Sequence, residues 1–184
     1  MAITAASNLN GSPISKNQLL VRASFIIGID GSSSISASSI GLSTAVDQER
    51  FRQLRSECDV VLIGGNTARS EPYASLKKPL AILTHENQKL IKEKSDCFQF
   101  NLSIAEVLPI LQTKFGSHIL IEAGWRLLKE AIELKLIDEL YLTINHTKKG
   151  ENPIDLNLIE RFLIKTDSKI IDGTELTKYI KRKS

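Results

Sequence analysis

The chain has 184 residues, of which 42% are apolar, and its 24 basic and 21 acidic side chains give a formal net charge of +3. This length and composition predict one domain with its own hydrophobic core and exclude a wholly disordered chain. Three basic residues at 181–183 account for the excess charge, so the rest of the chain is neutral. With few aromatic residues and no basic face, nucleic-acid binding is not indicated.

No apolar run reaches the roughly 18 residues that a membrane-spanning helix needs, and the N-terminus lacks the pattern of a signal peptide. The two cysteines, Cys58 and Cys97, lie far apart without a Cys-x-x-Cys motif, which is typical of a reducing compartment. The histidines lack metal-ligand spacing, so no metal site is predicted. We therefore expect a cytoplasmic protein with no membrane contact, with a flexible tail at 1–18, one domain at 19–180 and a basic tail at 181–184.

Strands and helices alternate along most of the chain. The expected strands lie at 19–29, 60–63, 80–83, 97–100, 118–122 and 140–146, and the expected helices at 44–58, 103–115 and 125–136. Past Pro153 the pattern changes to two segments, 162–166 and 175–180, around the turn signal Asp172-Gly173. This order predicts an α/β fold with a mostly parallel sheet, helices on both faces and a C-terminal antiparallel pair.

Three strand ends carry residues suited to ligand binding, because open parallel sheets bind ligands beyond the carboxyl ends of their strands. Asp30-Gly31 follows the first strand and is either a carboxylate facing a ligand or an ordinary turn. The segment Gly64 to Thr67 is either a phosphate-binding loop or a tight turn. Glu122 to Arg126 joins a strand to a helix whose first amides favour a phosphate. Since an unpaired buried charge is costly, Glu122 needs a ligand or an arginine partner.

Seven short segments along the chain form a recognisable series. They are Ile29-Asp30-Gly31, Gly41-Leu42-Ser43, Leu54-Arg55, Asp59 to Thr67, Glu71-Pro72-Tyr73, Ile121 to Gly124 and Ile137 to Leu140. Their order resembles the riboflavin-biosynthesis pyrimidine reductase family, the reductase half of the bifunctional deaminase-reductase, over about 20–179. The resemblance implies the dihydrofolate-reductase fold, NADPH as hydride donor and a homodimer. It also implies a phosphorylated pyrimidine substrate, 5-amino-6-(5-phosphoribosylamino)uracil, whose ribosyl group becomes ribityl.

The resemblance also assigns roles to individual residues. It places cofactor contacts at Gly65, Thr67, Glu71, Thr84, Ala123, Gly124, Trp125, Arg126 and Leu127, and substrate contacts at Ser43, Arg55 and Glu122. A guanidinium such as that of Arg55 suits a phosphate because its fork binds in two places. Opening the ribose ring and protonating the product call for a carboxyl group. We expect Asp30, at the heart of the crevice, to assist proton transfer and Glu122 to orient the substrate.

Two other functions fit the same residues. One is a related reductase of this fold that acts on another pterin-like or pyrimidine substrate. The other is a paralogue that binds a nucleotide without turnover, which is favoured by Ala123 standing where the family usually has glycine. A titration with the dinucleotide, followed by addition of the riboflavin-pathway substrate, separates these functions. Binding with turnover supports the first function, binding without turnover leaves the other two, and no binding excludes a reductase.

Overall fold

The apolar strand expected at 19–29 lies near the middle of the sheet. The computed structural model describes residues 18–182, and in it β1 (Leu20–Gly28) lies between β6 (His118–Ile121) and β7 (Glu139–Asn145). The other strands of this sheet are β3 (Val60–Gly64), β4 (Leu80–Leu83), β5 (Cys97–Phe100), β9 (Leu163–Ile171) and β10 (Thr174–Lys181). The continuous apolar sequence of β3 suits a strand whose two faces are both covered.

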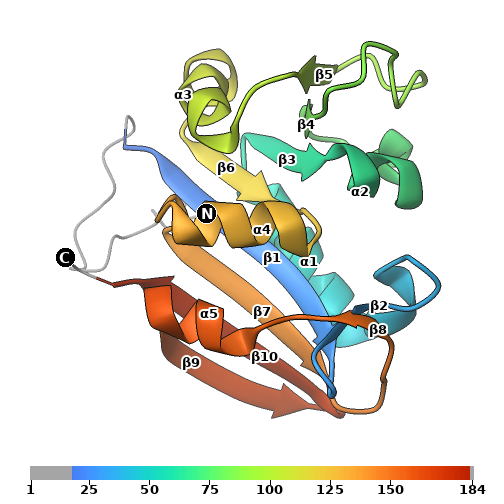
Figure 1. The fold of residues 1–184 in the computed structure, drawn as a ribbon, viewed down its shortest axis with the longest axis vertical. Helices are drawn as coiled ribbons and strands as arrows, with labels where there is room; N and C mark the ends of the chain where they lie inside the picture. Colours follow the sequence, from blue (N-terminus) through green and yellow to red (C-terminus); the bar gives the residue numbers. More distant parts are fainter. Residues whose placement is uncertain (1–17, 183–184) are drawn as a thin grey trace, which may run out of the picture.

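The eight strands follow the order β5-β4-β3-β6-β1-β7-β10-β9 (Figure 1). The first six in this order run parallel to one another, whereas β10 is antiparallel to both β7 and β9. The expected mostly parallel sheet with a C-terminal antiparallel pair is therefore confirmed. Because β10 extends to Lys181, the first residue of the predicted basic tail belongs to the sheet. Residues 1–17 and 183–184 of the predicted tails lie outside the described residues.

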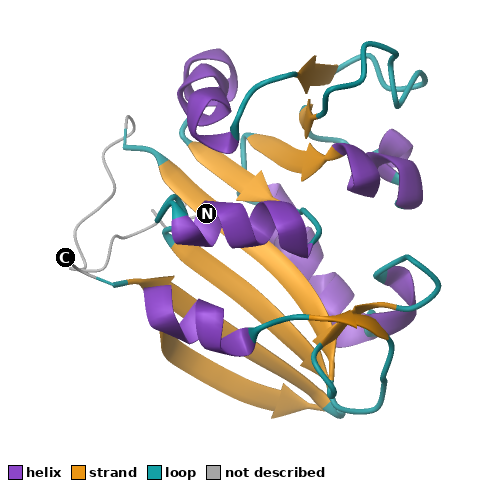
Figure 2. Cartoon of the chain, viewed as in Figure 1, coloured by secondary structure: helices purple, strands orange, loops and turns teal. Residues whose placement is uncertain are grey.

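Helices cover both faces of the sheet, as the sequence predicts (Figure 2). They are α1 (Ala45–Ser56), α2 (Gly65–Ser70), α3 (Ile104–Phe115), α4 (Trp125–Glu133) and α5 (Leu156–Phe162). Side chains of α3, α4 and α5 form one apolar cluster with the sheet, and side chains of α1 and α2 belong to a second cluster. In Figure 1, α4 and α5 lie in front of the sheet and α1 lies behind it.

The helix starts follow the sequence signals closely. Thr44 Oγ1 accepts a hydrogen bond from the amide of Asp47 at 3.2 Å and caps α1. Ser103 and Glu106 form the predicted capping box of α3. Such caps satisfy amides that have no partner inside the helix.

Several short elements differ from the expectation. The segment Gly64 to Thr67 was expected to be a phosphate-binding loop or a tight turn, but a helix begins at Gly65. Phe162 ends α5 instead of starting a strand. The strands β2 (Ser32–Ser34) and β8 (Glu151–Pro153) pair in a small second sheet, and 3-10 turns form at η1 (Ile40–Leu42) and η2 (Tyr73–Ser75). Elements of three to seven residues are too short to show a periodic pattern.

Both cysteines are free thiols, and burial raises the pKa of Cys58 to about 11. Within residues 18–182, no helix has the length and apolar character needed to cross a membrane.

Candidate active site

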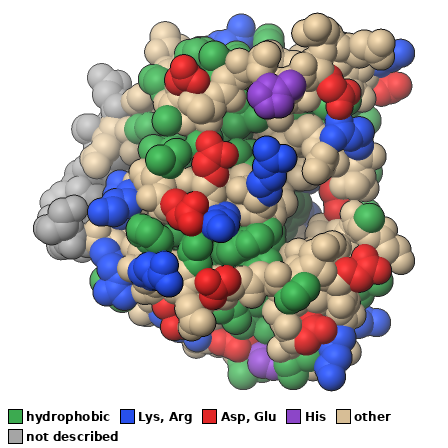
Figure 3. Space-filling model, viewed as in Figure 1, with side chains coloured by type: hydrophobic (Ala, Val, Ile, Leu, Met, Phe, Trp, Pro, Cys, Tyr) green, Lys and Arg blue, Asp and Glu red, His purple; other side chains and the backbone are tan. Residues whose placement is uncertain are grey.

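A cavity of about 970 Å³ opens beyond the carboxyl ends of the parallel strands. Figure 3 shows this face of the molecule hollowed on its right side, between the part that carries α2 and the part that carries β2 and β8. The cavity lining contains the residues predicted to bind substrate or cofactor, namely Ser43, Arg55, Gly65, Thr67, Glu71, Thr84, Glu122, Ala123, Gly124, Trp125, Arg126 and Leu127. Distant segments of the chain thus meet where the sheet topology predicts a ligand site.

Asp30 is the predicted site residue that the structure does not bring to the cavity. It lies two residues beyond β1 in an exposed turn, and it is not part of the cavity lining. Its carboxylate accepts hydrogen bonds from the amides of Ser32, at 3.1 Å, and Gly150, at 3.4 Å. Gly31 adopts a φ of 79° and turns the chain at this point. The expectation that Asp30 lies at the heart of the crevice was therefore wrong. Asp30 belongs to the turn after β1.

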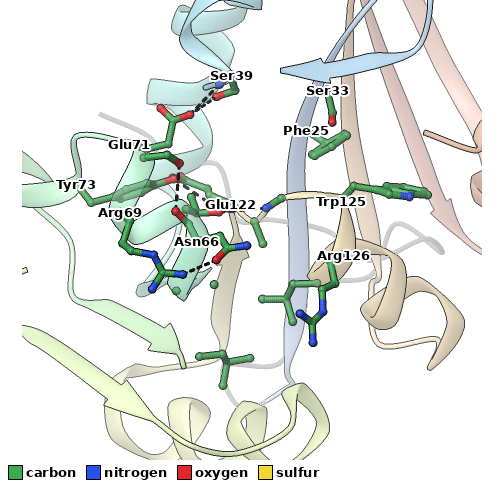
Figure 4. Close-up of a pocket in the computed structure, with 18 of the residues that line it drawn as sticks. Phe25, Ser33, Ser39, Asn66, Arg69, Glu71, Tyr73, Glu122, Trp125 and Arg126 are labelled. Atoms are coloured by element: carbon green, nitrogen blue, oxygen red, sulfur yellow. Dashed lines mark hydrogen bonds between the residues drawn. The ribbon is translucent and has the colours of Figure 1, made fainter. Parts of the chain in front are cut away.

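Glu122 is buried at the end of β6 and is fully engaged by protein groups (Figure 4). Arg55 donates to it through both prongs of the guanidinium, from Nε to Oε1 at 2.8 Å and from Nη2 to Oε2 at 2.6 Å. The hydroxyl of Tyr73 donates to Oε2 at 2.8 Å. Of the two alternatives for Glu122, the structure shows the arginine partner. The guanidinium of Arg55 also lies 4.1 Å above the ring of Phe51.

Burial and pairing set the protonation of this group of side chains. Burial raises the pKa of Glu122, and the hydrogen bonds from Arg55 and Tyr73 offset part of that rise. Burial lowers the pKa of Arg55, but the hydrogen bonds and charge of Glu122 outweigh it, so the net pKa is raised. Burial, followed by the charge of Glu122, raises the pKa of Tyr73 well above its ordinary value. Tyr73 therefore stays a neutral donor and Arg55 a cation.

Asp47 is a cavity residue that sequence reasoning missed. It is the third residue of α1, it is only 9% exposed, and it lines the cavity. Its two oxygens accept hydrogen bonds from Ser43 Oγ, at 2.9 Å, and Thr143 Oγ1, at 2.7 Å. Arg50 donates to the same Thr143 oxygen at 3.0 Å. In the sequence, the Thr44 to Asp47 spacing indicates only a helix N-terminus, so nothing marked Asp47 as a site residue.

The junction between β6 and α4 offers hydrogen-bond donors to the cavity. Gly124 caps α4, and its own amide donates to Thr67 Oγ1 at 3.2 Å. The next two amides, of Trp125 and Arg126, have no acceptor among residues 18–182, as expected for the first turn of a helix. The exposed guanidinium of Arg126 has no ion pair within the same range. Such a turn favours a phosphate group.

Two small residues shape the cavity walls. The methyl group of Ala123 packs into the apolar cluster on the α4 side of the sheet and is only 6% exposed. The fold thus accommodates alanine at this position. At Gly65, by contrast, an added Cβ would lie 2.9 Å from Thr84 Oγ1, so the close packing of α2 on the end of β4 requires glycine.

Glu71 fastens a loop that lines the cavity. One carboxylate oxygen accepts hydrogen bonds from Ser38 Oγ at 3.0 Å, from the Ser39 amide at 2.8 Å and from Ser39 Oγ at 3.0 Å (Figure 4). Ser38 and Ser39 belong to the serine-rich loop, residues 35–39, between β2 and η1. The carboxylate predicted to contact the cofactor therefore holds this loop beside the cavity.

The end of the cavity beyond β4 and β5 is lined by polar side chains. Arg69, on α2, donates to Glu86 and to the side-chain oxygen of Asn66 (Figure 4). His85 Nδ1 lies 2.5 Å from Asn101 Oδ1. These residues line the cavity beyond the ends of β4 and β5.

Comparison with known proteins gives structural but not sequence matches, since no family model and no curated protein matches the chain. The structure is similar to RibD of Acinetobacter baumannii, with a TM-score of 0.72 and 16% identity, over 92% of this chain and 60% of RibD. A pyrimidine reductase-like protein of Corynebacterium diphtheriae has a TM-score of 0.67 and 16% identity, with 91% and 94% of the two chains covered. Dihydrofolate reductase of Enterococcus faecalis, complexed with NADP(H), has a TM-score of 0.66 and 16% identity, with 89% and 97% covered. At these identities the matches establish the expected dihydrofolate-reductase-like fold.

Proposed function

We propose that the protein is a cytoplasmic, NADPH-dependent reductase of the riboflavin-pathway type. Its substrate would be 5-amino-6-(5-phosphoribosylamino)uracil, whose ribosyl group it reduces to ribityl. The observation that supports this most is the cavity itself, which joins the unpartnered first-turn amides of α4 to a buried carboxyl group, Asp47. The similarity in fold to RibD and to a dihydrofolate reductase complexed with NADP(H) is consistent with it.

The cavity suits a dinucleotide in both size and chemistry. Its volume of about 970 Å³ lies at the upper end of the range for small-molecule and cofactor sites. The amides of Trp125 and Arg126 and the cationic side chain of Arg126 would hold the pyrophosphate. Thr67 fixes the cap residue Gly124, and Gly64 and Gly65 line the same cavity. NADPH would supply the hydride, while the protein supplies orientation and a dry pocket.

The pair of Arg55 and Glu122 is the proposed substrate-orienting group. Arg55 uses Nε and Nη2 on Glu122, so Nη1 takes no part in the pair. That nitrogen can donate to the phosphate of the substrate while Glu122 holds the guanidinium plane in place. Ser43, which lies in the same wall of the cavity and donates to Asp47, would contact the substrate beside it. Glu122 then orients the substrate through Arg55.

Asp47, rather than Asp30 or Glu122, is the proposed proton donor. When the bond from the ribose ring oxygen to C1′ breaks, that oxygen must take up a proton, and C1′ then accepts the hydride. Glu122 is held by a cation, and Asp30 lies outside the cavity. The partners of the Asp47 carboxylate are two hydroxyl groups, which can rotate to accept as well as donate a hydrogen bond.

A turnover assay with matched variants tests this proposal. Loss of absorbance of the reduced nicotinamide is followed after the pyrimidine substrate is added to wild type, Asp47→Asn and Asp30→Asn. We expect turnover by wild type, a rate at least 100-fold lower for Asp47→Asn with unchanged NADPH binding, and an unchanged rate for Asp30→Asn. Equal loss in both variants would contradict the role of Asp47. Binding without turnover of this substrate would replace the proposal by a reductase of another substrate or a nucleotide-binding protein.

The homodimer remains a proposal that rests on the sequence resemblance. Sedimentation equilibrium of the full chain measures it directly, and we expect twice the chain mass of 20.4 kDa. A single species at the chain mass would contradict it.

A further inference from the structure

The sheet order determines which half of a bound dinucleotide lies where in the cavity. The α4 turn follows β6, which lies between β3 on one side and β1 on the other. A pyrophosphate on that turn therefore has one nucleoside toward β1 and the other toward β4 and β5. The β1 side carries the buried Asp47 and the ring pair of Phe25 and Trp125, with centroids 6.1 Å apart, and so suits the reacting ring. The adenosine then lies on the side of β4 and β5.

An ion pair between Arg69 and Glu86 lies on the side of β4 and β5. Arg69 Nη1 donates to Glu86 Oε1, and the two side chains are 47% and 49% exposed. Glu86 follows Thr84 at the end of β4, and its amide donates to Thr84 Oγ1 at 3.1 Å. Both members of the pair line the cavity, so each can exchange its protein partner for a ligand without leaving an uncompensated buried charge.

We propose that Arg69 and Glu86 read the 2′ position of the adenosine ribose, an inference that rests on the proposed function. Arg69 binds a 2′-phosphate, because a guanidinium makes bidentate, charge-assisted hydrogen bonds to phosphate. The carboxylate of Glu86 competes with that phosphate for Arg69, and its negative charge repels the phosphate. When the ribose carries a free 2′-hydroxyl, Glu86 accepts its hydrogen bond. Glu86 therefore limits how strongly the protein prefers NADPH to NADH.

Two nucleotides that differ only in the 2′-phosphate test this assignment without any turnover. Adenosine 2′,5′-bisphosphate and adenosine 5′-monophosphate are titrated into the full chain by calorimetry. We expect Arg69→Gln to weaken binding of the bisphosphate about tenfold and to leave binding of the monophosphate within about twofold. Glu86→Gln should strengthen bisphosphate binding several-fold and should not strengthen monophosphate binding.

Arg52→Gln is the matched control, because Arg52 is also an exposed arginine paired with a glutamate, Glu49, but does not line the cavity. It should bind both nucleotides as wild type does. The assignment is overturned if Arg69→Gln weakens both nucleotides equally, or if Glu86→Gln weakens the bisphosphate. In either case both nucleotides still bind, so the proposed function stands. If wild type binds neither nucleotide, the assignment and the proposed function both fail.

Discussion

At the scale of single residues, Gly65 shows how an absent side chain sets the packing of the cavity wall. A Cβ at this position would lie 2.9 Å from Thr84 Oγ1 and 3.2 Å from Thr84 Cβ, atoms close to the backbone that cannot move far. We expect Gly65→Ala to lower the free energy of unfolding in urea by about 1–3 kcal/mol, the usual cost of overpacking.

Gly64→Ser is the control for that substitution. The nearest atom to a Cβ at Gly64 is Leu127 Cδ2, at an ordinary 3.8 Å, and serine is a favoured N-cap for α2. Its free energy of unfolding should equal or exceed that of wild type. A larger loss for Gly64→Ser than for Gly65→Ala would contradict the packing described for Gly65 and Thr84.

The ion pair of Arg55 and Glu122 predicts a pH-dependent loss of stability. Arg55→Met leaves the carboxylate of Glu122 buried without a cation, which should cost about 3 kcal/mol at pH 7. Burial already raises the pKa of Glu122, and loss of Arg55 raises it further. A carboxyl whose folded pKa is raised binds its proton more tightly in the folded state, so stability falls as pH rises through the folded pKa. Urea unfolding of Arg55→Met should therefore show more of the wild-type stability at pH 5 than at pH 7. If the free energy of unfolding of Arg55→Met fell short of the wild-type value by the same amount at pH 5 and pH 7, the role of Glu122 would be contradicted.

Single residues were predictable from sequence where they follow a strand end. Thr84 and Glu122 stand directly after strands that the apolar pattern marks, and Thr67 is the third residue after such a strand. The structure brings all three to the cavity. Asp30 fits the same rule in sequence, but two residues of turn carry it away from the crevice. Asp47 could not be found in this way, because its burial depends on Thr143, which is 96 residues away in sequence.

At the scale of elements, Glu71 should control the mobility of the serine-rich loop. It accepts three hydrogen bonds from Ser38 and Ser39, and substitution by glutamine removes the charge that strengthens them. We expect amide hydrogens at 38–42 to exchange faster in Glu71→Gln, measured by mass spectrometry. Glu93→Gln, at an exposed position away from the cavity, should exchange as wild type does. Unchanged exchange in both variants would show that the loop does not depend on Glu71.

The central strands β1, β7 and β10 are joined by an ionic network that predicts acid sensitivity. Glu139 accepts from Arg22 at 3.1 Å, Tyr141 at 2.8 Å and Lys178 at 2.7 Å. Burial raises the pKa of Glu139, but the bonds from Lys178 and Tyr141 outweigh it and leave the pKa below 4.5. A lowered folded pKa gives stability that is complete above the unfolded value and is lost as pH falls through the folded one.

The matching variant is Glu139→Gln, followed by urea unfolding between pH 7 and pH 3. At pH 7 it should be less stable than wild type by about 1–3 kcal/mol, the usual range for hydrogen bonds to a charged group. The difference should shrink as the pH falls below 4.5. A difference that stays constant over this range would contradict the network.

Two local patterns made the main elements predictable, namely the helical spacing of apolar residues in the long helices and the unbroken apolar runs of the buried strands. The capping box of α3 and the apolar runs of β3 and β4 mark their ends within about one residue. The pairing of β2 with β8 could not be predicted, since these three-residue strands pair across more than 100 residues of chain. Its stability comes from tertiary contacts, which leave no local periodicity.

At the scale of the whole molecule, the cavity depends on an order of strands that local patterns do not contain. β6 is inserted between β1 and β3, although it follows both in the sequence. This insertion places the first turn of α4 between the two halves of the cavity and sets Glu122 against Arg55 of α1. The alternation of strands and helices predicted a parallel sheet, but it does not contain the strand order, which depends on contacts between distant segments of the chain.

Binding of a reduced nicotinamide dinucleotide in this cavity, on which the proposed function depends, can be measured through the protein's own fluorescence. Trp125 is the single tryptophan of the chain, and it lies in the first turn of α4 on the cavity wall. Titration of the full chain with NADPH should quench its emission in a saturable way, with one dinucleotide bound per chain and energy transferred to the reduced nicotinamide. Emission that falls only in proportion to the light absorbed by added NADPH, with no saturation, would contradict the account.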